Sequence, residues 1–304
     1  MQKNSLYTDK LKIAFVGQPE FFRCTYENDL QMLYTVKEFK LIFNAPWYYY
    51  VDLVEFSPDI TFFFGPQFYP EELLKKLKGI KIGLSSEPIP FYLNGKLYKS
   101  RDRLYRFNSL KNVKNKYDKF YHFCKQSIPF LIEQGFKVDG EFVFPVATDS
   151  YKPINYQKQY DVFFSGRETE HRMSYLGILL RDYKAIHIGY GIYGEEYVRL
   201  ISRCKIGLNI HVDNLPSLEH RVQNMMACGI MVMSETLLPN DFFTPGKDYV
   251  EFRNKKDFWG KFIYHLNQDS ERELIAKNGL KTVREKLNSV TCFKKLIDDI
   301  LKTG

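Results

Sequence analysis

Glycine, charged and hydroxyl residues follow directly after several short apolar runs of this sequence. In the second half these positions are Ser165-Gly166-Arg167, Gly189-Tyr190-Gly191, His211 and Ser234-Glu235. In the first half they are Gly17-Gln18-Pro19-Glu20, Gly65-Pro66 and Ser85-Ser86-Glu87-Pro88. Glycine allows a ligand to approach the backbone closely, and arginine or lysine side chains suit an anion. If the apolar runs are strands of parallel sheets, these residues meet at the edge where such sheets bind ligands.

The stretch from His220 to Glu235 passes from polar residues through Ala-Cys-Gly into a short apolar run. We expect a helix from Ser217 to Ala227, with Asn214 or Ser217 as its N-cap. One face of it is apolar, and a second stripe consists of Ser217, Arg221, Asn224 and Cys228. Gly229 then ends the helix, and Ile230–Met233 forms the next strand. The free N–H groups at the start of this helix, with Arg221 one turn in, suit a phosphate; alternatively, Arg221 and Asn224 cap or pair with neighbouring loops.

These residues need a scaffold, and the alternation of β-rich runs with helical periodicity predicts a parallel α/β architecture. The predicted strands are 12–16, 39–43, 59–64, 80–84, 117–124, 160–164, 184–188, 205–210 and 230–233. The predicted helices include 70–77, 128–134, 170–181, 195–203 and 217–227, and two or three amphipathic helices after Lys256.

A polar, proline-containing segment at residues 147–159 has the composition of a domain linker. We therefore expect an N-terminal Rossmann-like domain over residues 1–150. The second Rossmann-like domain, with the terminal helices, should occupy residues 151–304. In the helix expected at 270–286, Leu274, Ile275, Leu280 and Val283 should share one side.

The chain of 304 residues has a formal net charge of +8, which favours anionic partners. Nine basic residues are concentrated between Lys96 and Lys119: Lys96, Lys99, Arg101, Arg103, Arg106, Lys111, Lys114, Lys116 and Lys119. The sequence contains no recognised nucleic-acid module, and we expect no nucleic-acid partner. The five scattered cysteines, in no zinc-binding pattern, should be reduced and mostly buried. No apolar run is long enough for a bilayer and the start lacks a secretory signal, so we expect a cytoplasmic protein.

Several motifs occur in a familiar order: YDVFFSGRETEHRMSYLGILL, KAIHIGYG, YVRLISRCKIGLNIHVDNLPSLEHRVQNMMACGIMVMSE and FFTPGKDYVEFRN. Together they resemble the C-terminal half of a GT-B-type glycosyltransferase, and more closely the CgeB-like, spore-maturation group. FPVATDSYKP is similar to the inter-domain segment of such enzymes. The resemblance covers about residues 117–290. It implies two Rossmann-like domains that face one another across a cleft, with a nucleotide-sugar donor held mostly by the second.

The resemblance also assigns roles to the matching residues. Gly166 and Arg167 would lie beside the diphosphate, Tyr190 after Gly189 would lie near the base, and Arg172 would be a further cation for the leaving diphosphate. The phosphates and sugar would be surrounded by His211, Ser217, Leu218 and Arg221. No D-x-D metal motif is present, and Asp139-Gly140-Glu141 is better interpreted as a solvated turn. We therefore expect neither a metal nor a cofactor besides the nucleotide sugar itself.

One position departs from the family pattern. Where the family commonly has R-V-F-E, with the glutamate on the ribose hydroxyls, this chain has Arg221-Val222-Gln223-Asn224. Asn224 keeps an acceptor oxygen but loses the charge, so its hydrogen bonds should be weaker. A catalytic base should come from a strand end of the N-terminal domain, where Glu20 and Glu87 are the candidates. A retaining enzyme would not require that base.

The leading hypothesis is a metal-independent glycosyltransferase that moves a sugar from a nucleotide-diphosphate sugar to a glycan, lipid-linked or protein acceptor. The basic segment from Lys96 to Lys119 would contact an anionic membrane at its inner face, or a phosphate-bearing acceptor. Two alternatives stay open: a nucleotide-sugar epimerase or hydrolase with the same fold, and a degenerate binding protein without catalysis.

Overall fold

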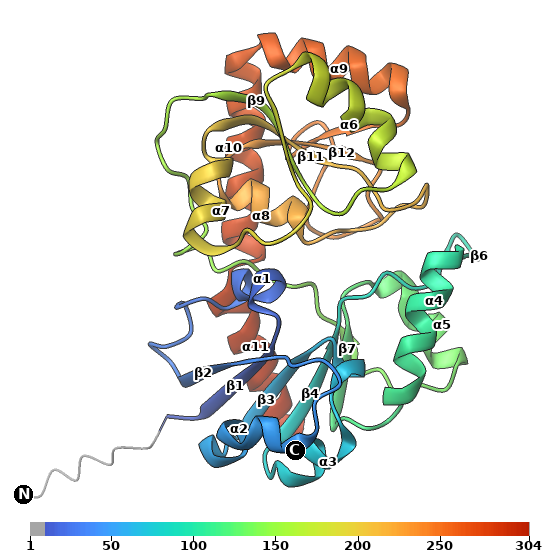
Figure 1. Ribbon diagram of the computed structural model, residues 1–304, viewed down its shortest axis with the longest axis vertical. Helices are drawn as coiled ribbons and strands as arrows, with labels where there is room; N and C mark the ends of the chain where they lie inside the picture. Colours follow the sequence, from blue (N-terminus) through green and yellow to red (C-terminus); the bar gives the residue numbers. More distant parts are fainter. Residues whose placement is uncertain (1–9, 304) are drawn as a thin grey trace, which may run out of the picture. The chain divides into compact units, whose positions relative to one another are not determined.

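The structure is a computed structural model, and it describes residues 10–303 (Figure 1). These residues divide into two compact units. The first contains residues 10–18 and 30–142, and the second contains residues 19–29 and 143–303. The boundary between residues 142 and 143 precedes the expected one at residue 150. The short segment 19–29 joins the second unit although it follows the first strand of the first.

The first unit is built on a six-stranded parallel sheet, visible in the lower part of Figure 1. Its strands are β1 (Lys12–Gly17), β2 (Thr35–Lys40), β3 (Ile60–Phe64), β4 (Ile80–Ser85), β7 (Lys119–His122) and β8 (Gly140–Glu141). The strand order is β2-β1-β3-β4-β7-β8, so the direction of winding reverses between β1 and β3. The sheet is accompanied by the helices α2 (Val51–Phe56), α3 (Glu71–Lys76), α4 (Arg101–Leu110) and α5 (Ile128–Glu133).

Strand β2 corrects one prediction, because the strand expected at 39–43 lies at Thr35–Lys40. β2 pairs with β1 from Lys12 opposite Thr35 to Gly17 opposite Lys40, and it ends where its partner ends. Ile42 and Phe43 lie beyond that point and are 40% and 49% exposed. The apolar run was misleading because an edge strand is set by pairing rather than by hydrophobicity alone. The short hairpin β5 (Phe91–Leu93) and β6 (Lys96–Tyr98) was not predicted.

The second unit contains a five-stranded parallel sheet. Its strands are β9 (Tyr160–Ser165), β10 (Ala185–Ile188), β11 (Cys204–Asn209), β12 (Met231–Glu235) and β13 (Val250–Phe252). Four of them were predicted and β13 was not. The order β10-β9-β11-β12-β13 reverses between β9 and β11. Ligands of such sheets bind at the carboxyl ends of the strands beside this reversal, which directs attention to the loops after β9 and β11.

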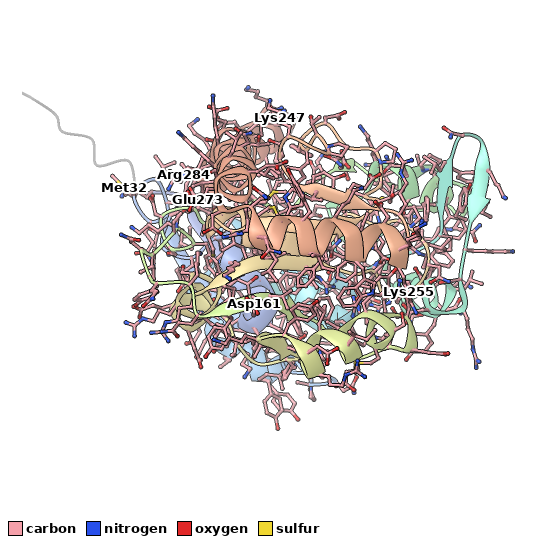
Figure 2. The ribbon with its side chains drawn as sticks, turned by 90° about the horizontal axis from the view of Figure 1, so that it is seen from above. Met32, Asp161, Lys247, Lys255, Glu273 and Arg284 are labelled. Atoms are coloured by element: carbon pink, nitrogen blue, oxygen red, sulfur yellow. The ribbon has the colours of Figure 1, made fainter. Side chains whose placement is uncertain are left out.

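Helices cover both faces of the second sheet. One apolar cluster joins α6 (Glu170–Asp182) and α9 (Lys255–Asn267) to the sheet through residues such as Tyr175, Phe258 and Phe262. Figure 2, in which Lys255 marks the start of α9 and Asp161 lies on β9, shows α6 and α9 side by side. A second cluster joins α7 (Gly194–Ile201) and α8 (Arg221–Ala227) to the opposite face.

The chain finishes with α10 (Asp269–Lys286) and α11 (Ser289–Thr303), so the expected terminal helices are present. The apolar side of α10 differs from the prediction, because Leu274 is 58% exposed while Arg272, Ala276 and Gly279 are buried. All five cysteines are free and four are buried, as expected. No helix within residues 10–303 is long and apolar enough to cross a membrane.

Candidate functional site

Two arginines meet at the loop after β9, beside the reversal of strand order. Arg172 lies in the first turn of α6, where the side chain of Thr169 caps the helix by accepting from the Arg172 N–H at 3.2 Å. Arg221 is the first residue of α8. Both guanidinium groups lie 5.3 Å from the ring of Phe164, so the two cations share one aromatic ring. The structure thus brings together two predicted residues that are 49 positions apart in the chain.

Gly166 makes this approach of the two arginines possible. Its φ of +148° lies in a region that side chains disfavour. A Cβ atom here would lie 2.6 Å from Arg221 Nη1 and 3.2 Å from Arg172 Nη1. Glycine is therefore favoured at position 166 because two guanidinium groups pack closely against the backbone there.

Backbone carbonyl oxygens, rather than carboxylates, hold both guanidinium groups. Arg172 donates from Nε to the Ile210 oxygen at 3.0 Å and from Nη1 to the Arg167 oxygen at 2.9 Å. Arg221 donates from Nη1 to the Ser165 oxygen at 2.6 Å. Within residues 10–303 neither forms an ion pair with a carboxylate. Burial and the neighbouring charge of Arg221 lower the pKa of Arg172 to about 9, and the charges of Glu219 and Glu235 offset this only in part.

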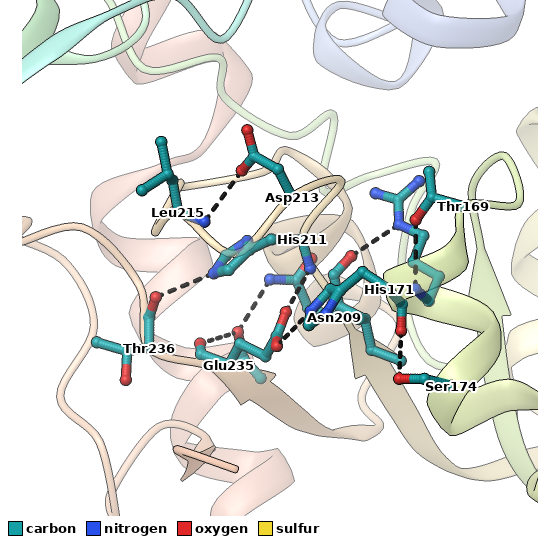
Figure 3. A network of polar contacts seen from close by, with 12 residues as sticks. Thr169, His171, Ser174, Asn209, His211, Asp213, Leu215, Glu235 and Thr236 are labelled. Atoms are coloured by element: carbon teal, nitrogen blue, oxygen red, sulfur yellow. Dashed lines mark hydrogen bonds and ion pairs between the residues drawn. The ribbon is translucent and has the colours of Figure 1, made fainter. Parts of the chain in front are cut away.

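A second network of polar contacts lies at the ends of β11 and β12, shown in Figure 3. The carboxylate of Glu235 lies 2.7 Å from His171 Nε2, and it accepts from the His211 N–H at 2.6 Å. The ring of His211 contacts the Thr236 oxygen at 3.0 Å and, on its other nitrogen, the carboxylate of Glu219 at 2.9 Å. His211 is 3% exposed, so its ring belongs to the interior of this network rather than to an open surface.

The start of α8 corrects the sequence prediction. The helix begins at Arg221, four residues after the expected Ser217, and no side chain caps it. Residues 216–219 are irregular, and Asp213 supports this loop by accepting from the Leu215 N–H at 3.0 Å. The helix start predicted at Ser217 is therefore wrong, and Arg221 is the first residue of the helix. Ser217 is buried, and Leu218 packs in the apolar core.

The remaining predicted donor residues lie around the same edge. Gly189 follows β10 and has open space where a Cβ would be. Tyr190 is 67% exposed, with its ring 5.7 Å from that of Phe21. Arg167 is exposed. Asn224 donates from Nδ2 to Cys24 Sγ at 3.4 Å, while its Oδ1 is buried without a hydrogen-bond partner.

The two carboxylates expected as catalytic bases lie in different units. Glu87 belongs to the first unit, where it pairs with Arg106 at 2.5 Å and lies 3.4 Å from Gln67 Nε2. Arg106 is also paired with Asp102 at 2.7 Å. Glu20 lies on α1 (Pro19–Phe22), in the segment that joins the second unit, whereas we expected it in the N-terminal domain.

The basic segment from Lys96 to Lys119 is partly neutralised in the first unit. Arg103 is buried and donates to the Ile89 oxygen at 3.2 Å, and Arg106 has the two carboxylate partners described above. Lys116 and Lys119 pair with Glu71 and Asp139 at 3.3 and 3.2 Å. The exposed basic residues outside these pairs are Lys96, Lys99, Arg101, Lys111 and Lys114.

Sequence reasoning missed Glu219 and His171, and it noted Glu235 only as a residue after a strand. His171 directly precedes Arg172 in the chain, and Glu219 lies two residues before Arg221. That proximity was a usable signal for both. The pairing of Glu219 with His211 required knowledge of the loop between β11 and α8.

Comparison with known proteins adds two findings. Residues 157–298, a little under half of the chain, match the family model described as glycosyl transferase-like. That region includes the arginine pair and the His211 network. A search of curated proteins gave no significant match.

Several solved structures match most of the chain. HepE from Anabaena, in complex with UDP and glucose, is 10% identical with a TM-score of 0.63, and the match covers 96% of this chain and all of that one. Sucrose-phosphate synthase from Thermosynechococcus elongatus is 10% identical with a TM-score of 0.62, covering 97% and 100%. TarM from S. aureus is 13% identical with a TM-score of 0.56; the match covers 83% of this chain but only 57% of TarM.

The chain has the GT-B fold. Identities of 10–13% show no more than the fold. This fold is consistent with the match of residues 157–298 to the glycosyl transferase-like family model. The arginine pair lies within the region that matches the family model, at the reversal of strand order in its sheet.

Proposed function

We propose that this chain is a metal-independent glycosyltransferase that transfers a sugar from a nucleotide-diphosphate sugar to a glycan, lipid-linked or protein acceptor. The observation that carries the proposal is the arginine pair. Two guanidinium groups converge on Gly166, held by carbonyl oxygens and without carboxylate partners in the described residues. Such a site is complete only when an anion supplies the missing negative charge.

Cleavage of the bond between the sugar and the diphosphate places negative charge on the departing phosphate oxygens. Arg172 and Arg221 are fixed before that charge develops, so they can stabilise it without rearrangement. In this proposal Gly166, Arg167 and the arginine pair bind the diphosphate, and Gly189 and Tyr190 lie near the base. Ser217, Leu218 and His211 shape the loop beside the phosphates and the sugar.

Asn224 takes the ribose position in this proposal. Its Oδ1 is buried without a protein partner, so it offers an acceptor to a hydroxyl group. Its Nδ2 is already engaged by Cys24.

The acceptor hydroxyl must lose a proton during transfer, and Glu20 and Glu87 are the proposed bases. Glu87 is held by Arg106 and Gln67, so its use as a base requires it to leave one of them. Glu20 belongs to the unit that carries the arginine pair.

The exposed basic residues Lys96, Lys99, Arg101, Lys111 and Lys114 are proposed to contact an anionic membrane or a phosphate-bearing acceptor. Replacing all five by glutamate should abolish cosedimentation with vesicles that contain phosphatidylserine, because the attraction depends on charge. Equal cosedimentation of the variant would rule the contact out.

The experiment that tests the donor is a thermal-shift screen against UDP, GDP, CDP, ADP and dTDP and their sugars, because a ligand of the folded state raises the melting temperature. HepE was solved with UDP and glucose, so UDP and UDP-glucose come first. A selective shift, followed by transfer of sugar to an added acceptor, supports the proposal. No shift with any nucleotide contradicts it.

A second candidate is a nucleotide-sugar-binding protein without catalysis, and Asn224 favours it. An asparagine bound to a buried thiol stands where the resembling family has a charged glutamate. Binding without release of sugar would select this candidate. Interconversion or hydrolysis of the sugar without any acceptor would select an epimerase or hydrolase.

A further inference from the structure

The two ring nitrogens of His211 both face groups that only accept hydrogen bonds. Nδ1 lies 2.9 Å from Glu219 Oε2, and Nε2 lies 3.0 Å from the Thr236 carbonyl oxygen. A neutral imidazole carries one N–H and one lone pair, so it can satisfy only one of these partners. Both contacts are hydrogen bonds only if both nitrogens carry hydrogen. The geometry therefore fits a doubly protonated, cationic ring in the interior of the second unit.

Glu219 and Glu235 act on the His211 ring, Arg172 and Arg221 act on Glu219, and His171 contacts the other carboxylate oxygen of Glu235. Burial alone lowers the pKa of His211, but Glu219, Glu235 and the Thr236 carbonyl outweigh burial and raise it above the ordinary value. Burial raises the pKa of Glu219, but His211, Arg221 and Arg172 lower it further than burial raises it. Both shifts favour the charged form of the pair.

Glu219 is the carboxylate most able to disable the arginine pair. It lies two residues before Arg221, and its charge acts on both Arg221 and Arg172. Its ion pair within residues 10–303 is nevertheless with His211. If Glu219 turned to either guanidinium group, it would occupy the hydrogen-bond donors that a diphosphate needs.

We propose that His211 is a positioning residue whose imidazolium holds the Glu219 carboxylate away from Arg172 and Arg221, so that both remain available to a diphosphate. This inference rests on the proposed function and gives His211 a role beyond direct contact with the donor. It also predicts that anion affinity depends on the protonation of a residue that the anion does not touch.

The pH dependence has a definite sign. Because the pKa of His211 is raised in the folded protein, its pair with Glu219 is fully present below the ordinary value of 6.5 and is lost as pH rises through the folded value. Loss of the proton removes the positive charge of the ring, and a neutral ring that still donates from Nδ1 holds Glu219 by a weaker hydrogen bond, so the carboxylate is freer to turn to the arginines. Anion affinity should therefore fall on the alkaline side, and a variant without His211 should lack this fall.

The test uses calorimetric titration with inorganic pyrophosphate, which represents the diphosphate of any nucleotide. His211→Gln should weaken pyrophosphate binding about tenfold, a change of about 1.4 kcal/mol. The double variant His211→Gln with Glu219→Gln should bind within about threefold of the wild type, because the competing carboxylate is gone. His265→Gln, the same substitution on α9 of the same unit, should leave affinity unchanged.

Three outcomes would overturn the inference: unchanged affinity in His211→Gln, a double variant as weak as His211→Gln, or an alkaline fall that persists in His211→Gln. A misfolded loop would weaken binding in the double variant as well, so the rescue separates positioning from a structural role.

A ligand-free measurement keeps the inference separate from the proposed function. Nitrogen NMR of the histidine rings should show His211 as an imidazolium at pH 7, and Glu219→Gln should lower its pKa. A neutral His211 ring, or a pKa that does not respond to Glu219→Gln, contradicts the inference whether or not pyrophosphate binds. Failure of the wild type to bind pyrophosphate, with the NMR result as expected, would contradict the proposed function alone.

Discussion

At the carboxyl edge of the second sheet, the hydrogen bonds that Arg172 and Arg221 donate within residues 10–303 go to backbone carbonyl oxygens. At the corresponding edge of the first sheet, Arg106 is paired with both Glu87 and Asp102. Each edge carries arginine beside strand ends, but positive charge is neutralised within the protein at one and left uncompensated at the other.

The difference indicates which edge is suited to an anionic ligand. A buried cation without a partner costs free energy, so it persists where an anionic ligand or transition state restores the balance. The edge with Arg106 needs no anion. This contrast supports the proposal that the diphosphate binds at the second unit.

The largest expected effect is the loss of diphosphate binding in Arg221→Ala. Removing hydrogen bonds to a charged ligand should weaken nucleotide diphosphate binding about 100-fold. Calorimetric titration measures it, with Arg106→Ala as the matched control at the edge of the first sheet. Equal losses of affinity in Arg221→Ala and Arg106→Ala would contradict the difference between the two edges.

Gly166→Ala should act more strongly on binding than on stability. The strained φ costs about 1–3 kcal/mol, and the contact at 2.6 Å displaces the mobile end of Arg221. Urea denaturation and nucleotide titration together measure both effects. Gly177 lies on α6 with no atom within 4 Å of the position of a Cβ, so Gly177→Ala should instead stabilise the protein by about 0.5–1 kcal/mol. Normal nucleotide affinity in Gly166→Ala would show that the close packing of the arginines is not required.

Asp29 offers the opposite case, a buried negative charge in the second unit. Burial first, then Asp149 and Glu27, raise the pKa of Asp29 to about 7 from 3.8. The folded protein thus holds the proton more tightly than the unfolded chain, and Asp29 costs stability increasingly as pH rises from about 4 to 7. Asp29→Asn should therefore gain about 1–2 kcal/mol at pH 8 and nothing near pH 4. Chemical denaturation at both pH values measures this gain, and a gain independent of pH would exclude the titration as its cause.

The smallest effect is expected for Glu87→Gln. Its pair with Arg106 is partly exposed, at 19% and 26% for the two side chains, so the loss of stability should stay below about 1 kcal/mol. Nucleotide affinity should not change. A thermal melt and a titration test both statements, and a weakened affinity would mean that the edge of the first sheet also binds the donor.

Local signals in the sequence were sufficient for much of the fold. Buried strands such as β3 and β9 stand out because short apolar runs are bounded by turn residues, and Gly229, with φ of +74°, ends α8 as predicted. Arg167 and Arg221 were also predictable, since one follows a strand end and the other lies near a helix start, whereas Arg172 was implied by the family resemblance.

Features that depend on distant contacts were not predictable. Leu218 continues the apolar periodicity of α8, so the helix was expected to include it, but a loop rather than a helix buries it. Segment 19–29 was assigned to the wrong unit because its contacts are with residues far along the chain. Cys24 contacts Asn224, and Phe22 packs against Phe144. The role of Glu219 likewise depends on His211 reaching it across an irregular loop.

The most direct test of the contrast between the two edges is hydrogen–deuterium exchange with and without a saturating nucleoside diphosphate chosen by the thermal-shift screen. The account predicts slower exchange at residues 165–172 and 209–224 of the second unit, and unchanged exchange at residues 85–87 and 101–106 of the first. Protection confined to the first unit, or no protection at the arginine pair, would contradict it.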